Sequence, residues 1–123
     1  MRKVNNFILL LVVLFLVGCA STGSYTYSTS TIDTPYSKGS DAYYKENYEE
    51  AIKYFKQHIS ENPEDDVLLD MALYNLANSY KELGDKNNAI STYQKLIDKF
   101  KEGYWVDSAK EEIEKLRKWL ILV

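Results

Sequence analysis

The chain has 123 residues, and 15 Lys and Arg stand against 18 Asp and Glu, which gives a formal net charge of −3 at pH 7. This length allows one small domain beside any targeting segment. The charges alternate in sign along the chain and do not form the clusters of Lys and Arg that phosphate contacts need, so the composition argues against nucleic acid as a partner.

The first 18 residues have the pattern of a secretory signal peptide. Arg2 and Lys3 give a positive start, and residues 7–17 form an unbroken apolar run of about 11 residues. A run of this length suits the apolar core of a signal peptide, whereas a membrane-spanning helix needs roughly 20 apolar residues. Gly18 provides the small residue before the expected cleavage, so we predict a signal peptide over residues 1–18.

The residues Leu16-Val17-Gly18-Cys19 resemble the lipobox of bacterial lipoproteins. The resemblance implies that the mature chain begins at Cys19 and that this thiol carries acyl chains such as palmitate, which contribute about 0.8 kcal/mol per buried CH₂ to membrane anchoring. Ala20 stands where Asp would imply retention in the inner membrane, so the resemblance implies an outer-membrane lipoprotein facing the periplasm. An uncleaved membrane anchor and an ordinary buried thiol are the alternatives for Cys19.

The segment after Cys19 is rich in Ser and Thr up to Thr34 and has almost no aliphatic side chains. Such a composition cannot bury enough apolar area to offset the entropy of ordering. We therefore predict a lipidated N-terminus and disordered tether over residues 19–34, which as a flexible coil spans roughly 20 Å.

The remaining residues, 35–123, show helical periodicity. Thr34 as N-cap and Pro35 in the first turn predict a helix that ends at about Glu46. Apolar side chains at helical spacing predict four further helices, within residues 48–59, 69–83, 89–100 and 106–120. We expect Asp65 or Asp66 to cap the second of these four. No stretch alternates with a period of two residues, so we expect an all-α fold.

Two of the predicted helices repeat one pattern. The block Tyr48–Ile52 with Phe55 corresponds to the block Lys86–Ile90 with Tyr93, and Ala51 and Ala89 are 38 positions apart. A further set has the spacing of the first helix of a tetratricopeptide repeat: Leu73, Leu76, Ala77, Tyr80 and Gly84. Residues 35–120 thus resemble this family, which implies an α-solenoid of about two and a half repeats. The long spacing is similar to that of barrel-assembly and cell-division-coordinator lipoproteins of the bacterial envelope.

The sequence contains no pattern typical of a catalytic or metal site. His58 is the only histidine, and we interpret it as a packing or helix-end residue. Metal binding would need at least two His or Cys ligands at suitable spacing. We interpret the pairs Asp65-Asp66 and Glu111-Glu112 as a helix cap and a solvated face. The chain is therefore expected to be neither an enzyme nor a carrier of a metal or cofactor.

The tetratricopeptide resemblance implies that the first helix of each pair lines a concave groove. In the second repeat the groove positions would be Met71, Tyr74, Asn75, Asn78 and Lys81. Asn side chains there can hydrogen-bond a peptide backbone, and Tyr and Met can supply adaptable apolar contact. A plain solvated helix face is the alternative, and the basic residues of a carboxylate-binding clamp are not evident on the flanking helices.

The C-terminal residues Trp119-Leu120-Ile121-Leu122-Val123 are wholly apolar, and one helical face can bury only part of them. They are expected either to cap the repeats or to contact a partner or a second copy, chiefly through Trp119, Leu120 and Leu122.

Together these features lead to two hypotheses for the function. The first is a lipid-anchored scaffold that binds other proteins or peptides of the cell envelope, in outer-membrane protein assembly or in the coordination of the envelope and division. The second is a structural envelope lipoprotein that forms homo-oligomers.

Overall fold

The computed structural model describes residues 33–64 and 67–122, which belong to a unit spanning Thr31–Val123. This part of the chain contains five helices and no strand: α2 (Pro35–Tyr44), α3 (Tyr48–Glu61), α4 (Leu69–Glu82), α5 (Lys86–Phe100) and α6 (Tyr104–Leu122). The predicted all-α fold is therefore confirmed. The predicted signal peptide, and Cys19 with all but the last two residues of the predicted tether, lie outside the described residues.

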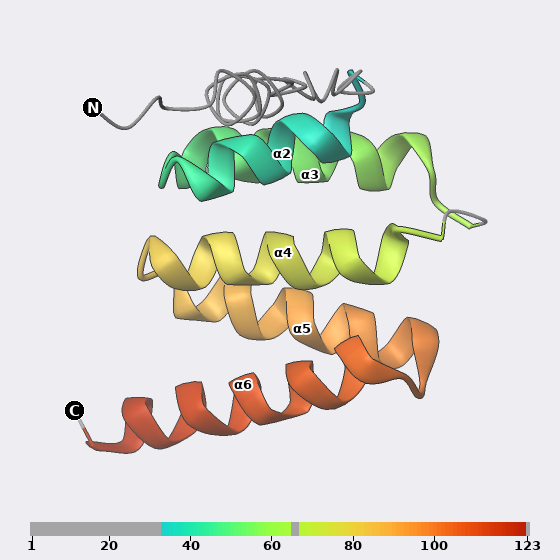
Figure 1. The fold of residues 1–123 in the computed structure, drawn as a ribbon. Coiled ribbons are helices and arrows are strands. Elements are labelled where there is room, and N and C mark those ends of the chain that lie inside the picture. The colour runs from blue at the N-terminus through green and yellow to red at the C-terminus, as the bar shows by residue number, and fades with distance from the viewer. Residues whose placement is uncertain (1–32, 65–66, 123) are drawn as a thin grey trace, which may run out of the picture. The chain divides into compact units, whose positions relative to one another are not determined.

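The helices stack in chain order, and each packs against the next (Figure 1). Helix α4 also contacts both α2 and α6, so these three helices lie on the same side of the stack. We call the surface formed by α2, α4 and α6 the three-helix face, and the surface formed by α3 and α5 the two-helix face.

Helix α2 begins where the sequence predicts. The backbone N–H of Ser37 donates to Oγ1 of Thr34 at 3.2 Å, and the backbone N–H of Thr34 donates to Oγ of Ser37 at 3.3 Å. This reciprocal capping box satisfies two backbone donors that the first turn would leave open, and Pro35 adds a preset φ at the first helical position.

Helix α2 ends two residues before the predicted end, at Tyr44. Glu46 adopts a φ of 59°, and the N–H of Asn47 then donates to the carbonyl of Ala42 at 2.9 Å. This arrangement is a Schellman motif, in which a left-handed residue terminates the helix. The left-handed position of this motif usually holds Gly, so Glu46 did not indicate a helix end at the level of sequence.

Helix α4 also ends in a Schellman motif, 38 positions later in the chain. Gly84 has a φ of 80°, and the N–H of Asp85 donates to the carbonyl of Tyr80 at 2.9 Å. The two turns therefore occupy equivalent places in successive repeats, one with Glu46 and one with Gly84.

The predicted cap of α4 is wrong. The N-cap is Leu68, which makes no side-chain capping hydrogen bond, and the helix begins at Leu69. Asp65 and Asp66 lie outside the described residues and at least two positions before the N-cap. Leu69, the first residue of the helix, is 2% exposed, so burial of its side chain stabilises the start of the helix.

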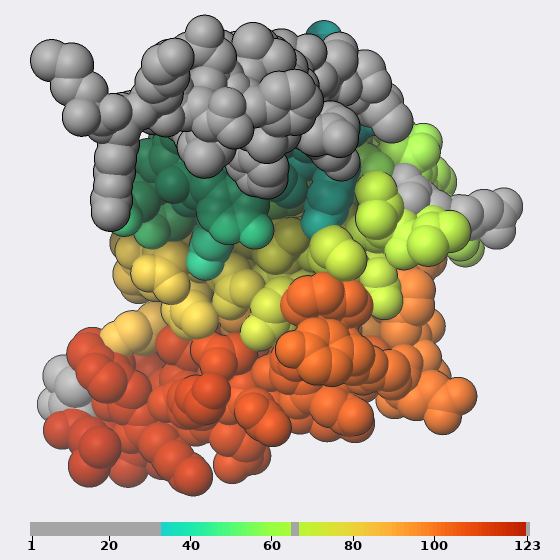
Figure 2. All heavy atoms as spheres, in the orientation of Figure 1, coloured from blue at the N-terminus to red at the C-terminus, as the bar shows by residue number. Residues whose placement is uncertain are grey.

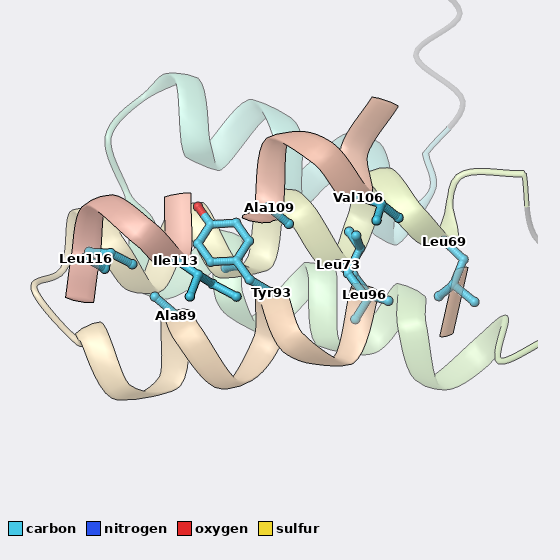
Figure 3. Close-up of a cluster of buried hydrophobic side chains, with 10 residues drawn as sticks. Leu69, Leu73, Ala89, Tyr93, Leu96, Val106, Ala109, Ile113 and Leu116 are labelled. Carbon is cyan, nitrogen blue, oxygen red and sulfur yellow. The ribbon is translucent and has the colours of Figure 1, made fainter. Parts of the chain in front are cut away.

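The main core lies between α4, α5 and α6, and Figure 3 shows its side chains around Tyr93. The cluster consists of Leu69, Leu73, Ala77, Ala89, Tyr93, Leu96, Val106, Ala109, Ile113 and Leu116. A smaller cluster of Ala42, Ala51, Phe55 and Leu76 joins α2 and α3 to α4. Each large buried side chain contributes about 1.5–3 kcal/mol, so most of the stabilisation lies in the second repeat and α6.

Candidate protein-binding surfaces

The predicted groove residues all lie on α4 and are half-buried. They are Met71, Tyr74, Asn75, Asn78 and Lys81, and each touches a neighbouring helix. What they can offer to a partner therefore depends on which of their atoms these internal contacts already occupy.

Two of them are held by α2. The hydroxyl of Tyr36 donates to Sδ of Met71 at 2.6 Å, and Nδ2 of Asn75 donates to the Tyr36 oxygen at 3.2 Å. Burial raises the pKa of Tyr36, so its hydroxyl stays protonated and can keep donating at neutral pH. One N–H of the Asn75 amide is thus used at the contact between α2 and α4.

Tyr74 lies in a group of aromatic rings that joins α4 to α6. Its ring centroid is 4.8 Å from that of Trp105 and 5.6 Å from that of Tyr93. The ring of Tyr104 stands edge-on to Trp105 at 4.9 Å and is 75% exposed. We call Tyr74, Tyr104 and Trp105 the aromatic patch, since these three rings form a stepped surface that reaches from half-buried to exposed.

Asn78 is hydrogen-bonded to Tyr93 of α5. Its Oδ1 accepts a short hydrogen bond from the hydroxyl of Tyr93, whose ring is fully buried. Burial raises the pKa of Tyr93 far above its ordinary range, so the hydroxyl donates at every physiological pH. One acceptor site of the Asn78 oxygen is therefore used within the fold.

Lys81 is paired with α6. Its Nζ lies 2.9 Å from Oε2 of Glu112, and Nζ of Lys115 lies 2.7 Å from the other carboxylate oxygen. Burial alone would raise the pKa of Glu112, but the hydrogen bonds from Lys115 and Lys81 outweigh it and hold that pKa below its ordinary value. Lys81 is therefore paired within the fold, and it shares the single negative charge of Glu112 with Lys115.

The two contacts between α4 and α6 join residues with the same sequence separation. Tyr74 and Trp105 are 31 positions apart, as are Lys81 and Glu112, so α4 and α6 run in the same direction side by side. The interpretation of Glu111-Glu112 as a solvated face is wrong for Glu112, whose side chain is 15% exposed and paired with Lys81, and Trp105 was not predicted to lie on this face. A parallel alignment of the predicted helices at this offset would have placed them there.

His58 is buried, with 4% of its surface exposed, and its ring stands edge-on to Tyr36 at 5.4 Å. Its backbone carbonyl accepts hydrogen bonds from the N–H and Nδ2 of Asn62 at the end of α3. These contacts are those of a packing residue near a helix end, as predicted. Among the described residues, His, Cys, Asp and Glu side chains form no group of three or more that could hold a metal ion.

The last turn of α6 is exposed rather than packed on the repeats, and Figure 2 shows it in red at the end of the stack. Ile121 and Leu122 are 83% and 84% exposed, and Trp119 is half-exposed beneath the ammonium group of Lys86. Desolvation there lowers the pKa of Lys86. We call Trp119, Leu120, Ile121 and Leu122 the C-terminal tip, because the core that they were expected to cap already ends at Leu116.

None of the described helices is both long enough and apolar enough to cross a bilayer.

Comparison with known proteins identifies the repeats. Residues 36–65 and residues 71–102 each match the tetratricopeptide repeat family. No curated protein and no solved structure matches the chain. The two matches cover α2 with α3 and α4 with α5, which are the two helix pairs of the stack. The chain is therefore a member of the tetratricopeptide-repeat family, with one repeat in each of its two helix pairs and α6 packed on the second.

Proposed function

We propose that this protein is a lipid-anchored scaffold of the bacterial envelope that binds another envelope protein through the aromatic patch. Tetratricopeptide repeats generally mediate protein–protein interaction, which supports the binding part of the proposal. The observation that carries it is the patch itself, where Tyr74, Trp105 and Tyr104 lie in contact on the three-helix face.

The chemistry of the patch suits a protein partner. Aromatic side chains are enriched at interfaces because they bury a large area and lose few rotatable bonds. Tyr74 and Trp105 are already fixed by ring contacts with α5 and with each other, so binding costs them little further entropy. The Asn and Lys side chains beside them each make a polar contact within the fold, so the exposed aromatic rings are the larger surface that this face offers to a partner.

The anchoring part of the proposal rests on the sequence pattern around Cys19. A lipidated Cys19 and a tether would hold the repeats near a membrane and raise their effective concentration for partners at that surface. Processes such as outer-membrane protein assembly and coordination of the envelope and division fit such a scaffold. The proposed site is the periplasmic face of the outer membrane.

Photocrosslinking in native membranes tests the proposed binding surface. A photoreactive residue replaces Tyr104 in the full-length protein, and a matched variant carries it at Glu114, an exposed position on the same helix. We expect one defined protein adduct from position 104 and a several-fold weaker one from position 114. Equal labelling from both positions, or labelling of lipid alone at position 104, would refute the patch as a binding surface.

The C-terminal tip favours a second candidate function, a structural lipoprotein that associates with itself. The tip exposes Trp119, Leu120, Ile121 and Leu122 in one helical turn, which is more apolar surface than a soluble monomer usually leaves in contact with water. Sedimentation of the detergent-solubilised full chain separates the candidates. A monomeric mass that Ile121→Ser and Leu122→Ser together leave unchanged excludes self-association, whereas a dimer that these substitutions dissociate favours it.

A further inference from the structure

The two-helix face carries a groove of about 350 Å³ between α3 and α5. Its floor is apolar and comes mainly from α4, with Leu73, Leu76 and Tyr80 beside Ile59 of α3. Its walls are polar and carry Lys56 and Ser60 on one side and Asn88, Ser91, Thr92 and Lys95 on the other. The groove lies on the opposite layer of the stack from the aromatic patch, because α3 and α5 form one layer and the patch belongs to α4 and α6.

The two lysines make this groove electropositive within an acidic protein. Repeat spacing places Lys56 at the level of Gln94, next to Lys95, so the two lysines lie at similar heights on the α3 and α5 walls of the groove. None of the lining residues, all of which lie in the described part of the chain, carries a carboxylate. Two like charges that share a groove without a counter-charge favour the binding of an anion.

Ten further lysines lie on the described helices and turns, and five of them, Lys45, Lys53, Lys86, Lys101 and Lys118, make no ion pair with a carboxylate of the described residues. The other five are paired. Ion pairs with carboxylates are made by Lys38, Lys81, Lys99, Lys110 and Lys115. Within the described residues, Lys56 and Lys95 make no such pair, and Lys56 instead lies over the Tyr80 ring at 5.6 Å from its centroid. This contact keeps one ammonium group directly above the apolar floor.

We propose that this groove binds an acidic peptide segment of a partner protein, with one aliphatic side chain on the floor and a carboxylate at each lysine. The volume lies at the lower end of the range for ligand sites, which suits a single side chain and its flanking residues. Ser60, Asn88 and Ser91 are exposed along the rim, where a peptide backbone would need hydrogen-bond partners. The Ser60 hydroxyl donates to the Gln57 carbonyl and Nδ2 of Asn88 donates to Asp85, so the groups offered to a peptide are the Ser60 oxygen as an acceptor, Oδ1 of Asn88 and the Ser91 hydroxyl. The inference rests on the proposed protein-binding function and gives it a second surface with its own chemistry.

A short synthetic peptide is the probe. It is a fluorescent, C-amidated pentapeptide with a leucine between two glutamates, and a twin carries two glutamines in their place. Fluorescence anisotropy at fixed ionic strength measures binding to the full-length protein in zwitterionic lipid nanodiscs. The test variant is Lys56→Gln with Lys95→Gln, and the matched control is Lys110→Gln with Lys118→Gln, which removes the same charge from the exposed side of α6.

We expect the test variant to weaken binding of the glutamate peptide at least fivefold and the control variant to change it less than twofold. The glutamine twin should bind at least fivefold more weakly to the unmodified protein and should not respond to the test variant. Equal losses in both variants, or equal binding of both peptides, would overturn the proposal. Either result would show that Lys56 and Lys95 do not bind the carboxylates of the peptide. A change in the sedimentation mass of the protein with the test variant would assign the groove to a second copy and also overturn it. Crosslinking from position 104 tests the aromatic patch, which lies on the other layer of the stack. A negative result in the peptide assay would therefore overturn the groove proposal without deciding whether the aromatic patch binds a partner.

Discussion

Gly39 of α2 lies so close to the ring of Phe55 that a Cβ at position 39 would fall 2.8 Å from Cδ1 of Phe55. Phe55 is fully buried and cannot move aside without disturbing Ala42, Ala51 and Leu76 around it. Gly39 therefore sets the distance between α2 and α3 in the first repeat. In the second repeat, Ala77 and Tyr93 occupy the equivalent positions, 38 residues later, and both are fully buried there.

Substitution of Gly39 by Ala is expected to destabilise the domain by about 1–2 kcal/mol. Ala favours a helix over Gly by up to about 1 kcal/mol, but overpacking against a buried ring costs roughly 1–3 kcal/mol and outweighs that gain. Urea denaturation followed by circular dichroism measures the change. In a double-mutant cycle, Phe55→Leu should restore part of the loss, and strictly additive effects would show that the ring is not the cause.

Glu46 and Gly84 give a matched pair of substitutions with opposite expected signs. Both residues hold a left-handed conformation at the same point of successive repeats, with φ of 59° and 80°. Glu46→Gly should stabilise the domain by about 1 kcal/mol, because a side chain is strained there, and Gly84→Ala should destabilise it by a similar amount.

Thermal melting checks this pair. A change of about 1 kcal/mol shifts the melting temperature of a domain of this size by roughly 4–8 °C. A lower melting temperature for Glu46→Gly would mean that the carboxylate of Glu46 contributes more than its backbone strain costs.

The ion pair of Lys81 with Glu112 should make stability depend on acid pH. The pKa of Glu112 is lowered in the folded protein from its ordinary value of 4.5, so the stabilisation is fully present above that value and is lost as the pH falls through the folded pKa. Glu112→Gln should cost about 1 kcal/mol at pH 7, and the difference from the unmodified protein should shrink below pH 4.5. Denaturation at several pH values measures this, with exposed Glu111→Gln as the control. A difference that stays constant down to pH 3 would contradict the ion-pair origin.

The C-terminal tip should contribute almost nothing to the stability of the repeats. Ile121 and Leu122 are more than four-fifths exposed, so their replacement by Ser together should change the free energy of unfolding by less than about 0.5 kcal/mol. Leu116→Ala, one turn earlier and 7% exposed, should cost about 2–4 kcal/mol. Differential scanning calorimetry compares the two, and a large loss from the Ser substitutions would show that the tip caps the core after all.

Much of the fold could be predicted from the sequence because helical periodicity and the repeat are local signals. Thr34 as an N-cap and Pro35 in the first turn indicate the start of α2, and Gly84 indicates the end of α4. The failures occurred where tertiary packing replaced a local signal: Leu68 in place of an acidic N-cap, and Glu46 in a left-handed conformation that rarely admits a side chain.

The predicted surfaces fared differently from the fold. Spacing alone placed Asn75, Asn78 and Lys81 on one face of α4, but it could not show that each of them makes a polar contact with Tyr36, Tyr93 or Glu112 of a neighbouring helix. Such contacts join residues 15–39 positions apart and depend on how helices align with one another. The aromatic patch depends on the same alignment, since Tyr74 and Trp105 meet only when α4 and α6 lie side by side.

The central claim, a scaffold that works because it is anchored, is tested most directly by crosslinking from position 104 in cells that carry either Cys19 or Cys19→Ala. The account predicts that Cys19→Ala lowers the yield of the defined protein adduct several-fold, while the helical circular dichroism signal and melting temperature of the purified protein stay the same. An undiminished adduct with Cys19→Ala would contradict it, because partner binding would then be independent of the membrane anchor.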